Sequence, residues 1–287
     1  MQAARILSAV NIQLPLALGY TLAYSRTNIE SLGSFWWLSL YGLGMQLYIV
    51  FLNDWADRSA DILNQRPTMF SGGSRVLVQA KLYPIQLRNA GLVFGCLALI
   101  WGIALGIFFS RPLLPMLCLV GLGLLWLYSL YPAKLNYRFG GEVLQALGVG
   151  GLLPIVAFYF ITGHLLEPDI VGFIFGYYLL QLAAAVAFTL PDVEADKESG
   201  KGTIAVHFGV INAVRISFSF SIVGMLVLWF NSVNIKTIFL PLFGLLLMSL
   251  IPVKDNCWQR SSLFITSMLI FPVITFTVVF ILSVFIR

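Results

Sequence analysis

Charged residues are scarce in this sequence: Asp, Glu, Lys and Arg make up 10% of its 287 residues. A water-soluble domain of this size would carry roughly 25% charged residues. Hydrophobic residues make up 59% of the chain, which leaves too little polar surface to cover a soluble globule. The composition therefore excludes a soluble globular protein and indicates an integral membrane protein.

Cysteine is also scarce, with three residues at Cys96, Cys118 and Cys257. Their wide separation matches neither the paired spacing of a metal site nor a disulfide framework. Cys96 and Cys118 fall within apolar runs, where we expect them to be small buried hydrophobes.

Long apolar runs dominate what is present. About 20 consecutive apolar residues are needed to cross a hydrocarbon core of about 30 Å. The spans must be helices, because an isolated strand cannot satisfy its backbone in lipid, and the runs are too continuous for barrel strands. We predict an all-α integral membrane protein of about nine transmembrane helices, folded as a single polytopic domain over residues 1–287. The predicted spans are 6–24, 33–52, 87–109, 112–131, 142–162, 170–190, 211–231, 236–252 and 261–285.

Lys and Arg are distributed unevenly between the two sides that these spans define. Thirteen of the 17 lie on one side or just inside its helices, and the remaining four lie on the other. The positive-inside rule places the richer side in the cytoplasm, with the N-terminus and the loops 53–86, 132–141, 191–210 and 253–260. We expect the cell inner or plasma membrane if the source is prokaryotic. The basic residues are placed to meet lipid headgroups or an anionic substrate, and the net charge of +5 does not indicate nucleic acid.

Two carboxylate pairs follow predicted spans on the cytoplasmic side. Asp57 and Asp61 follow the second span, and Asp192 and Asp196 follow the sixth. Residues four apart share one face of a helix, and Asn53 extends the first pair into a polar stripe. Mg²⁺ typically takes one or two carboxylates and completes its shell with water and substrate phosphate. Two such pairs could bind Mg²⁺ on either side of a diphosphate and neutralise the charge of the leaving group.

The alternative is that these acids are ordinary solvated helix ends. Two copies at the ends of apolar helices argue against it, because acids close to a membrane span are costly and usually functional. Asp54, Glu194 and Glu198 lie off the stripes and are predicted to be surface charges.

Basic and glycine-rich segments follow both pairs. Gly72-Gly73, with Arg66 and Arg75 nearby, can present backbone N–H groups and guanidinium groups to phosphate. Lys134 and Lys201 lie in two further loops of the same side. Polar residues inside spans are expected to join helices by hydrogen bonds, with Asn11 as the candidate cavity-lining group. The others are Gln13, Gln46, Gln145 and Gln181.

The paired motif resembles the UbiA-type intramembrane aromatic prenyltransferases. The resemblance covers nearly the whole chain and is carried by these segments: Asn53-x-x-x-Asp57-x-x-x-Asp61, Tyr131-Pro132-Ala133-Lys134, Phe139-Gly140-Gly141-Glu142, Asp192-x-x-x-Asp196 and Gly200-Lys201-Gly202-Thr203. It implies a helical bundle around a central cavity, with Mg²⁺ and diphosphate at the cytoplasmic mouth. The implied metal–diphosphate residues are Asn53, Asp57, Asp61, Asp192 and Asp196, and the implied phosphate contacts are Arg66, Lys134 and Lys201.

Within the superfamily, residues 70–77 look more like the dihydroxynaphthoate branch, which serves menaquinone biosynthesis. Arg66-Pro67 also fits the hydroxybenzoate branch, so the pattern is mixed. Gly202 replaces an Arg that is common after the Lys in this family, which removes one expected phosphate contact.

The resulting hypothesis is a Mg²⁺-dependent transfer of an isoprenyl group from a polyprenyl diphosphate to an aromatic acceptor, through an allylic carbocation. A membrane terpene cyclase of the same superfamily would ionise the same diphosphate without an acceptor. A CDP-alcohol phosphotransferase shares Asp-x-x-x-Asp, but its upstream Asp-Gly-x-x-Ala-Arg is absent. A divalent-cation transporter is the third alternative, although no acid lies near the middle of any predicted span.

Overall fold

A computed structural model describes residues 2–27, 33–65, 67–68, 72–165, 167–231, 241, 244 and 258–285. Every regular element within these residues is a helix, so the all-α prediction is confirmed. The chain divides into two compact units. The first unit comprises residues 1–62, 73–134 and 152–166, and the second comprises 63–72, 135–151 and 167–287.

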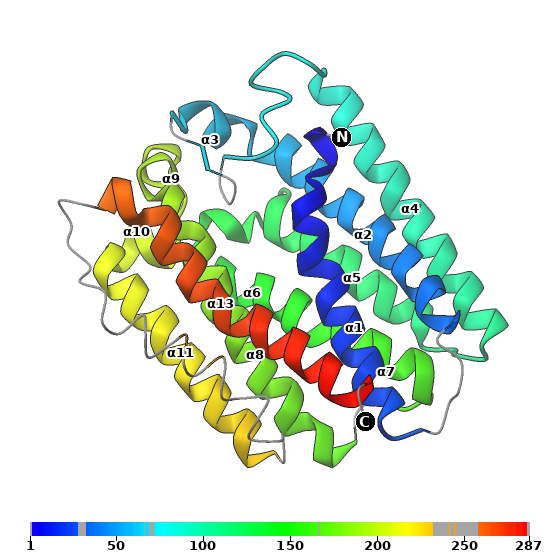
Figure 1. The fold of residues 1–287 in the computed structure, drawn as a ribbon. Coiled ribbons are helices and arrows are strands. Elements are labelled where there is room, and N and C mark those ends of the chain that lie inside the picture. Colours follow the sequence, from blue (N-terminus) through cyan, green and yellow to red (C-terminus); the bar gives the residue numbers. More distant parts are fainter. Residues whose placement is uncertain are drawn as a thin grey trace. The chain divides into compact units, whose positions relative to one another are not determined.

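The first unit is built mainly from five apolar helices. In this unit α2 packs against α4, α1 packs against α7 and α2, and α5 packs against α4 and α7 (Figure 1). Two short 3₁₀ helices, Gln2–Ala4 and Ile6–Ala9, precede α1. The bounds are α1 Val10–Tyr24, α2 Gly33–Ala56, α4 Pro84–Phe108, α5 Leu114–Ser129 and α7 Leu153–Thr162, and α3, Arg58–Leu63, follows α2.

Glycines on the buried face of α4 allow the close approach of α2. A Cβ on Gly91 would lie 2.8 Å from Leu52 Cδ2, and a Cβ on Gly95 would lie 2.7 Å from Tyr48 Cδ2. Small residues at such contacts let membrane helices pack closely, since dispersion rather than the hydrophobic effect holds them together in lipid. Tyr48 reaches past Gly95 and donates its hydroxyl to Leu122 O at 2.9 Å, which ties α2 to α5.

Gly19 provides the corresponding close approach between α1 and α7 and gives a stability prediction. A Cβ there would lie 2.7 Å from Pro154 Cα, so Gly19→Ala must push the two helices apart. We expect it to cost about 1–3 kcal/mol of unfolding free energy, as overpacking does. Gly123→Ala on α5 is the matched control, because nothing lies within 4 Å of its built Cβ. Thermal unfolding in detergent should fall for Gly19→Ala alone; equal midpoints for the two variants would contradict the packing.

The second unit is arranged around α8. In this unit α8 packs against α6, α11 and α13 (Figure 1). Tyr177 of α8 is fully buried, and its hydroxyl is bonded to Gln181 Nε2 at 2.9 Å and to Thr277 Oγ1 of α13 at 3.2 Å. The bounds are α6 Gly141–Ala146, α8 Pro168–Thr189, α9 Val193–Ser199, α10 Ile204–Phe208, α11 Val210–Phe230 and α13 Trp258–Phe285. A 3₁₀ helix, Leu135–Tyr137, precedes α6, a π-helix, Leu147–Leu152, follows it, and a second 3₁₀ helix, Leu190–Asp192, joins α8 to α9.

Eight of the nine predicted spans coincide with described helices to within a few residues. Six helical stretches of the described chain are long and apolar enough to cross a membrane: Gly33–Ala56, Pro84–Phe108, Gly141–Thr162, Ile170–Ser199, Val210–Phe230 and Phe264–Phe285. Leu114–Ser129 is apolar but shorter, and α1 has 15 residues. The predicted span 236–252 lies outside the described residues apart from 241 and 244, so the count of nine stays a prediction.

The cysteine prediction is half right. Cys118 is buried, whereas Cys96 is exposed. Cys96 falls on the outer face of α4 beside Val93, Leu97 and Ile100, which are exposed apolar residues. Such a face suits contact with lipid, where an apolar side chain needs no protein neighbour.

Candidate active site

The first acid stripe forms at the end of α2, where the helical path continues beyond the last residue of the helix. Asp57 N donates to Asn53 O at 2.8 Å, and Asp61 N donates to Asp57 O at 2.9 Å. This four-residue bonding keeps the three side chains on one face, as predicted. The side chain of Asp57 is buried and that of Asp61 is partly exposed.

Asn53 is held by a second helix. Its Oδ1 accepts a hydrogen bond of 2.8 Å from Ser129 Oγ at the end of α5. This bond fixes the orientation of the Asn53 side-chain amide. Asp57 follows one helical turn later on the same stripe.

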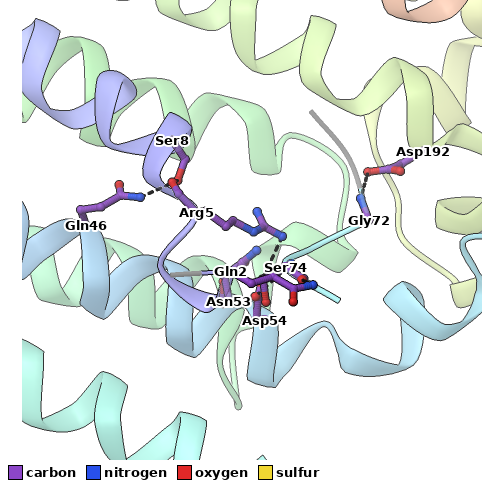
Figure 2. Close-up of polar contacts among 10 residues, drawn as sticks. Gln2, Arg5, Ser8, Gln46, Asn53, Asp54, Gly72, Ser74 and Asp192 are labelled. Atoms are coloured by element: carbon purple, nitrogen blue, oxygen red, sulfur yellow. Dashed lines mark hydrogen bonds and ion pairs between the residues drawn. The ribbon is translucent and has the colours of Figure 1, made fainter. Parts of the chain in front are cut away.

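The prediction that Asp54 is a surface charge is wrong. Its residue is only 3% exposed, and Oδ1 lies 2.8 Å from Arg5 Nη2 (Figure 2). Oδ2 accepts a hydrogen bond of 3.1 Å from Ser74 N. The predicted second span stopped at residue 52, but α2 runs to Ala56 and carries Asp54 within it, where the ion pair offsets the cost of burying a carboxylate.

The glycine-rich turn contacts carboxylates rather than facing away from them. Gly73, at φ +67°, adopts a left-handed backbone conformation, and a Cβ there would overlap Asp61 Oδ2. Ser74 N–H, which follows the Gly72-Gly73 turn, is directed at Asp54. Arg75 Nη1 donates to the backbone oxygen of Asp61. The turn thus packs directly on the first acid stripe, and only glycine fits at its point of closest approach.

The second acid pair lies where α8 passes through a 3₁₀ turn into α9. Asp192 Oδ1 accepts a hydrogen bond of 2.5 Å from Asn64 Nδ2, and Oδ2 accepts one of 3.4 Å from Gly72 N (Figure 2 shows the latter). Asp196 is buried, with Lys201 Nζ at 3.5 Å from its Oδ1. Glu194 and Glu198 on α9 are exposed, as predicted.

Lys201 is placed by a sharp chain reversal after α9. Gly200 ends the helix at φ +79°, and Lys201 N donates to Asp196 O at 2.8 Å. Its ammonium group lies 5.6 Å from the centre of the Tyr137 ring. A lysine held between a carboxylate and an aromatic face is well placed to act as a local positive charge.

The remaining predicted residues are placed as follows. Asn11 is exposed on α1, and Lys134 Nζ lies 5.5 Å from the centre of the Tyr131 ring. Gln13 and Gln46 join segments as expected, donating to Ser39 O of α2 at 3.1 Å and Ser8 Oγ at 2.5 Å. Arg66 lies outside the described residues. The first unit thus contains Asn11, Asn53, Asp57, Asp61, Arg75 and Lys134, and the second contains Asp192, Asp196 and Lys201.

The donor chemistry of both sets fits Mg²⁺. Within the described ranges, no three His, Cys, Asp or Glu side chains gather into a cluster that could hold a metal ion alone. Mg²⁺ does not require one, because it keeps several waters and binds through one or two carboxylates together with substrate phosphates. Asp57 and Asp61, or Asp192 and Asp196, supply that number of hard oxygen ligands.

Three features were missed from the sequence. The Arg5–Asp54 ion pair joins residues 49 positions apart, and no local sequence pattern indicates it. Asn64 gives no signal beyond its place after the stripe. Glu142 is 3% exposed and bonded to a distant backbone, and its only signal is its place in the Phe139-Gly140-Gly141-Glu142 segment.

Known proteins share this fold and sequence pattern. The model of the UbiA prenyltransferase family matches residues 13–263. Chloroplastic chlorophyll synthases from Oryza sativa subsp. japonica and Avena sativa are each 32% identical over 170 residues, or 58% of this chain. The alignments span 43% and 42% of those two proteins, less than half of their length.

Solved structures agree in fold. A UbiA homologue from Archaeoglobus fulgidus bound to DMAPP and Mg²⁺ gives a TM-score of 0.68 at 17% identity, covering 96% of this chain and 98% of that one. The apo structure of a UbiA homologue from Aeropyrum pernix K1 gives 0.71 at 14% identity, covering 96% and 97%. The fold and its apolar helices define an integral membrane protein. The chain belongs to the UbiA prenyltransferase family, as the extent of the family match shows.

Proposed function

We propose that this protein transfers a prenyl group from a prenyl diphosphate to an aromatic acceptor, with Mg²⁺ as cofactor. The observation that carries the proposal is the pair of Asp-x-x-x-Asp sets, each with one buried aspartate, Asp57 or Asp196, in a chain of this family. The relatives support it: homologues of the same fold bind DMAPP or GPP together with Mg²⁺, and chlorophyll synthases align over much of the chain.

The chain's own residues have distinct parts in the proposed reaction. Asp57 and Asp61, and likewise Asp192 and Asp196, are the metal–diphosphate carboxylates, and Asn53, whose Oδ1 accepts a hydrogen bond from Ser129, is a further metal–diphosphate residue. Bound Mg²⁺ supplies neutralisation of the charge that develops on the leaving diphosphate. Arg66, Arg75, Lys134 and Lys201 are the proposed phosphate contacts, and Asn11 lines the substrate cavity.

The bond changes are simple. The C–O bond between the allylic carbon and the diphosphate breaks, and the diphosphate leaves with the electron pair. A ring carbon of the acceptor then forms a C–C bond to the allylic carbon, and the ring loses a proton, or carbon dioxide where that carbon carries a carboxylate. Apolar and aromatic side chains exclude water from the cation, which water would otherwise capture.

The arrangement in the membrane is part of the same proposal. We place the N-terminus and the loops that carry both acid sets in the cytoplasm, because thirteen of the 17 Lys and Arg residues lie on that side. The whole chain, 1–287, acts as one polytopic catalytic domain around a central cavity. The dihydroxynaphthoate branch remains the preferred acceptor class, on the sequence of residues 70–77.

The test is a transfer assay of the purified protein in detergent with Mg²⁺ and geranylgeranyl diphosphate. The acceptors are dihydroxynaphthoate, hydroxybenzoate, homogentisate and geranylgeranylglyceryl phosphate. The last is included because a digeranylgeranylglyceryl phosphate synthase shares the fold with a TM-score of 0.62 at 14% identity. Mass spectrometry should detect one prenylated aromatic product, and EDTA should abolish it.

Each other product would contradict the proposal in its own way. A cyclised terpene without acceptor would move the chain to the cyclases. Prenylation of the glyceryl phosphate alone would replace the aromatic acceptor. Undiminished product in EDTA would contradict the role of Mg²⁺.

A further inference from the structure

Glu142 is a buried acid that the proposed reaction does not use. It follows Gly141 at the start of α6 and is 3% exposed. Its Oε1 accepts a hydrogen bond of 2.6 Å from Ile204 N, 62 residues further along the chain. Its Oε2 is buried without a hydrogen-bond partner in the described part of the chain. Burying a carboxylate with one oxygen left without a partner is costly, which indicates that its hydrogen bond to Ile204 has a purpose.

The bond secures the beginning of α10. The first N–H groups of a helix have no partner within it and need one from elsewhere. Thr203 Oγ1 accepts from Val206 N at 3.3 Å, and Glu142 accepts from Ile204 N. The start of α10 is thereby fixed to the start of α6.

The same segment packs tightly on the loop before α6. A Cβ on Gly202 would lie 3.1 Å from Phe139 N and 3.2 Å from Arg138 C, so a larger residue would require the neighbouring backbone to give by a few tenths of an ångström. Glycine, which stands here where the family often has arginine, fits this close contact. The departure from the family pattern permits close packing here and at the same time removes a basic side chain.

Lys201 lies between the two fixed points of this segment. On the N-terminal side, the backbone N–H of Lys201 donates to Asp196 O at 2.8 Å. On the C-terminal side, Gly202 packs on residues 137–139, and the N–H of Ile204 donates a hydrogen bond to Glu142. With both ends of the 201–204 segment fixed, the ammonium group stays near Asp196 Oδ1 and the Tyr137 ring.

We infer that Glu142 is a positioning residue, which through Ile204 holds Lys201 beside Asp196 in the geometry that binds the diphosphate. This inference rests on the proposed function for the role of Lys201 and Asp196. The bond of Glu142 to the 201–204 segment stands independently of it. The proposed reaction needs Lys201 near Asp196. From that position its ammonium group can form a charge-assisted hydrogen bond to a phosphate oxygen of the incoming substrate.

The test compares three variants. Glu142→Leu removes the acceptor and leaves Ile204 N–H unsatisfied, whereas Glu142→Gln keeps a carbonyl oxygen at the same place. Glu198→Gln is the matched control, because Glu198 is an exposed glutamate of the same unit. Hydrogen exchange is measured over residues 200–208, and the KM for geranylgeranyl diphosphate and for the acceptor are measured separately.

Glu142→Leu should exchange faster over 200–208 while α8 stays protected, and should raise the KM for the diphosphate about tenfold, the effect of losing roughly one charged contact. The KM for the acceptor should change little. Glu142→Gln should restore both readouts to within about threefold of the wild type, and should do so even if Glu142→Leu fails to fold.

Unchanged exchange over 200–208 in Glu142→Leu would overturn the inference, as would an increase in the acceptor KM alone. A Glu142→Gln variant as impaired as Glu142→Leu would also overturn it, because the charge and not the bond to Ile204 would then matter. If the wild type transfers no prenyl group, the proposed function fails, and the exchange data still decide whether Glu142 holds the segment.

Discussion

Asp57→Asn is expected to reduce prenyl transfer by about a hundredfold to a thousandfold, the range seen when one preorganised electrostatic group is removed. Asn keeps the shape and one oxygen but lacks the charge that a divalent cation needs. Asp57 is buried, and its backbone position is fixed by the bonds to Asn53 and Asp61. Little solvent is therefore available to replace the lost ligand. The measurement is kcat at saturating diphosphate over a range of Mg²⁺ concentrations.

The control for this prediction is Glu198→Gln, an exposed acid off both stripes, which should retain full activity. Asp57→Asn should also require more Mg²⁺ for half-maximal rate, because the loss acts through the metal. Full activity of Asp57→Asn at ordinary Mg²⁺ would refute the metal role of the first stripe. A loss with unchanged Mg²⁺ dependence would assign Asp57 to structure alone.

Asp54→Leu is expected to lower stability more than any other substitution of an acid near the first stripe. It leaves the guanidinium of Arg5 partly buried without its partner and Ser74 N–H without its acceptor. Removing one partner of a buried ion pair costs about 3–5 kcal/mol of unfolding free energy. Because the side chain of Arg5 is 29% exposed, we expect a loss of about 2–3 kcal/mol here. Thermal unfolding in detergent measures it.

A double-mutant cycle separates the pair from its surroundings. Arg5→Met combined with Asp54→Leu should cost less than the sum of the two single changes, because both charges are then gone. Additive losses would show that Arg5 and Asp54 do not interact. Lys81→Met is the control for a cation of the same unit, because its contact with Gln2 is exposed.

The membrane spans and the first acid stripe could be predicted because their signals are local. About 20 apolar residues suffice to indicate a span, and four-residue spacing suffices to place Asn53, Asp57 and Asp61 on one face. The interruption of α2 at Asp57 did not disturb that stripe, because its backbone bonds continue through it.

The features that could not be predicted depend on contacts between distant segments. Asp54 lies off the stripe and was predicted to be a surface charge, yet it is buried in an ion pair with Arg5, 49 residues earlier. The amides of the Gly72-Gly73 turn were expected to face phosphate, but in the structure Gly72 N–H is bonded to Asp192, and Ser74 N–H, next in the chain, is bonded to Asp54. Only the folded chain reveals which acid each amide contacts.

Cys96 shows a different limit. In a membrane, apolar residues are stable on both the protein-facing and the lipid-facing side of a helix. Composition alone therefore does not show which of the two faces carries a given residue. Its neighbours Val93 and Leu97 are exposed apolar residues, as suits the outer face of α4.

The most direct test of the central claim is the Mg²⁺-dependent release of diphosphate from geranylgeranyl diphosphate, compared among the wild type, Asp57→Asn and Asp196→Asn. The account predicts release by the wild type with Mg²⁺ and acceptor, none in EDTA, and a loss of about a hundredfold in each variant. Release that persists in EDTA, or that survives in both variants, would contradict the role of the two acid sets in ionising the substrate.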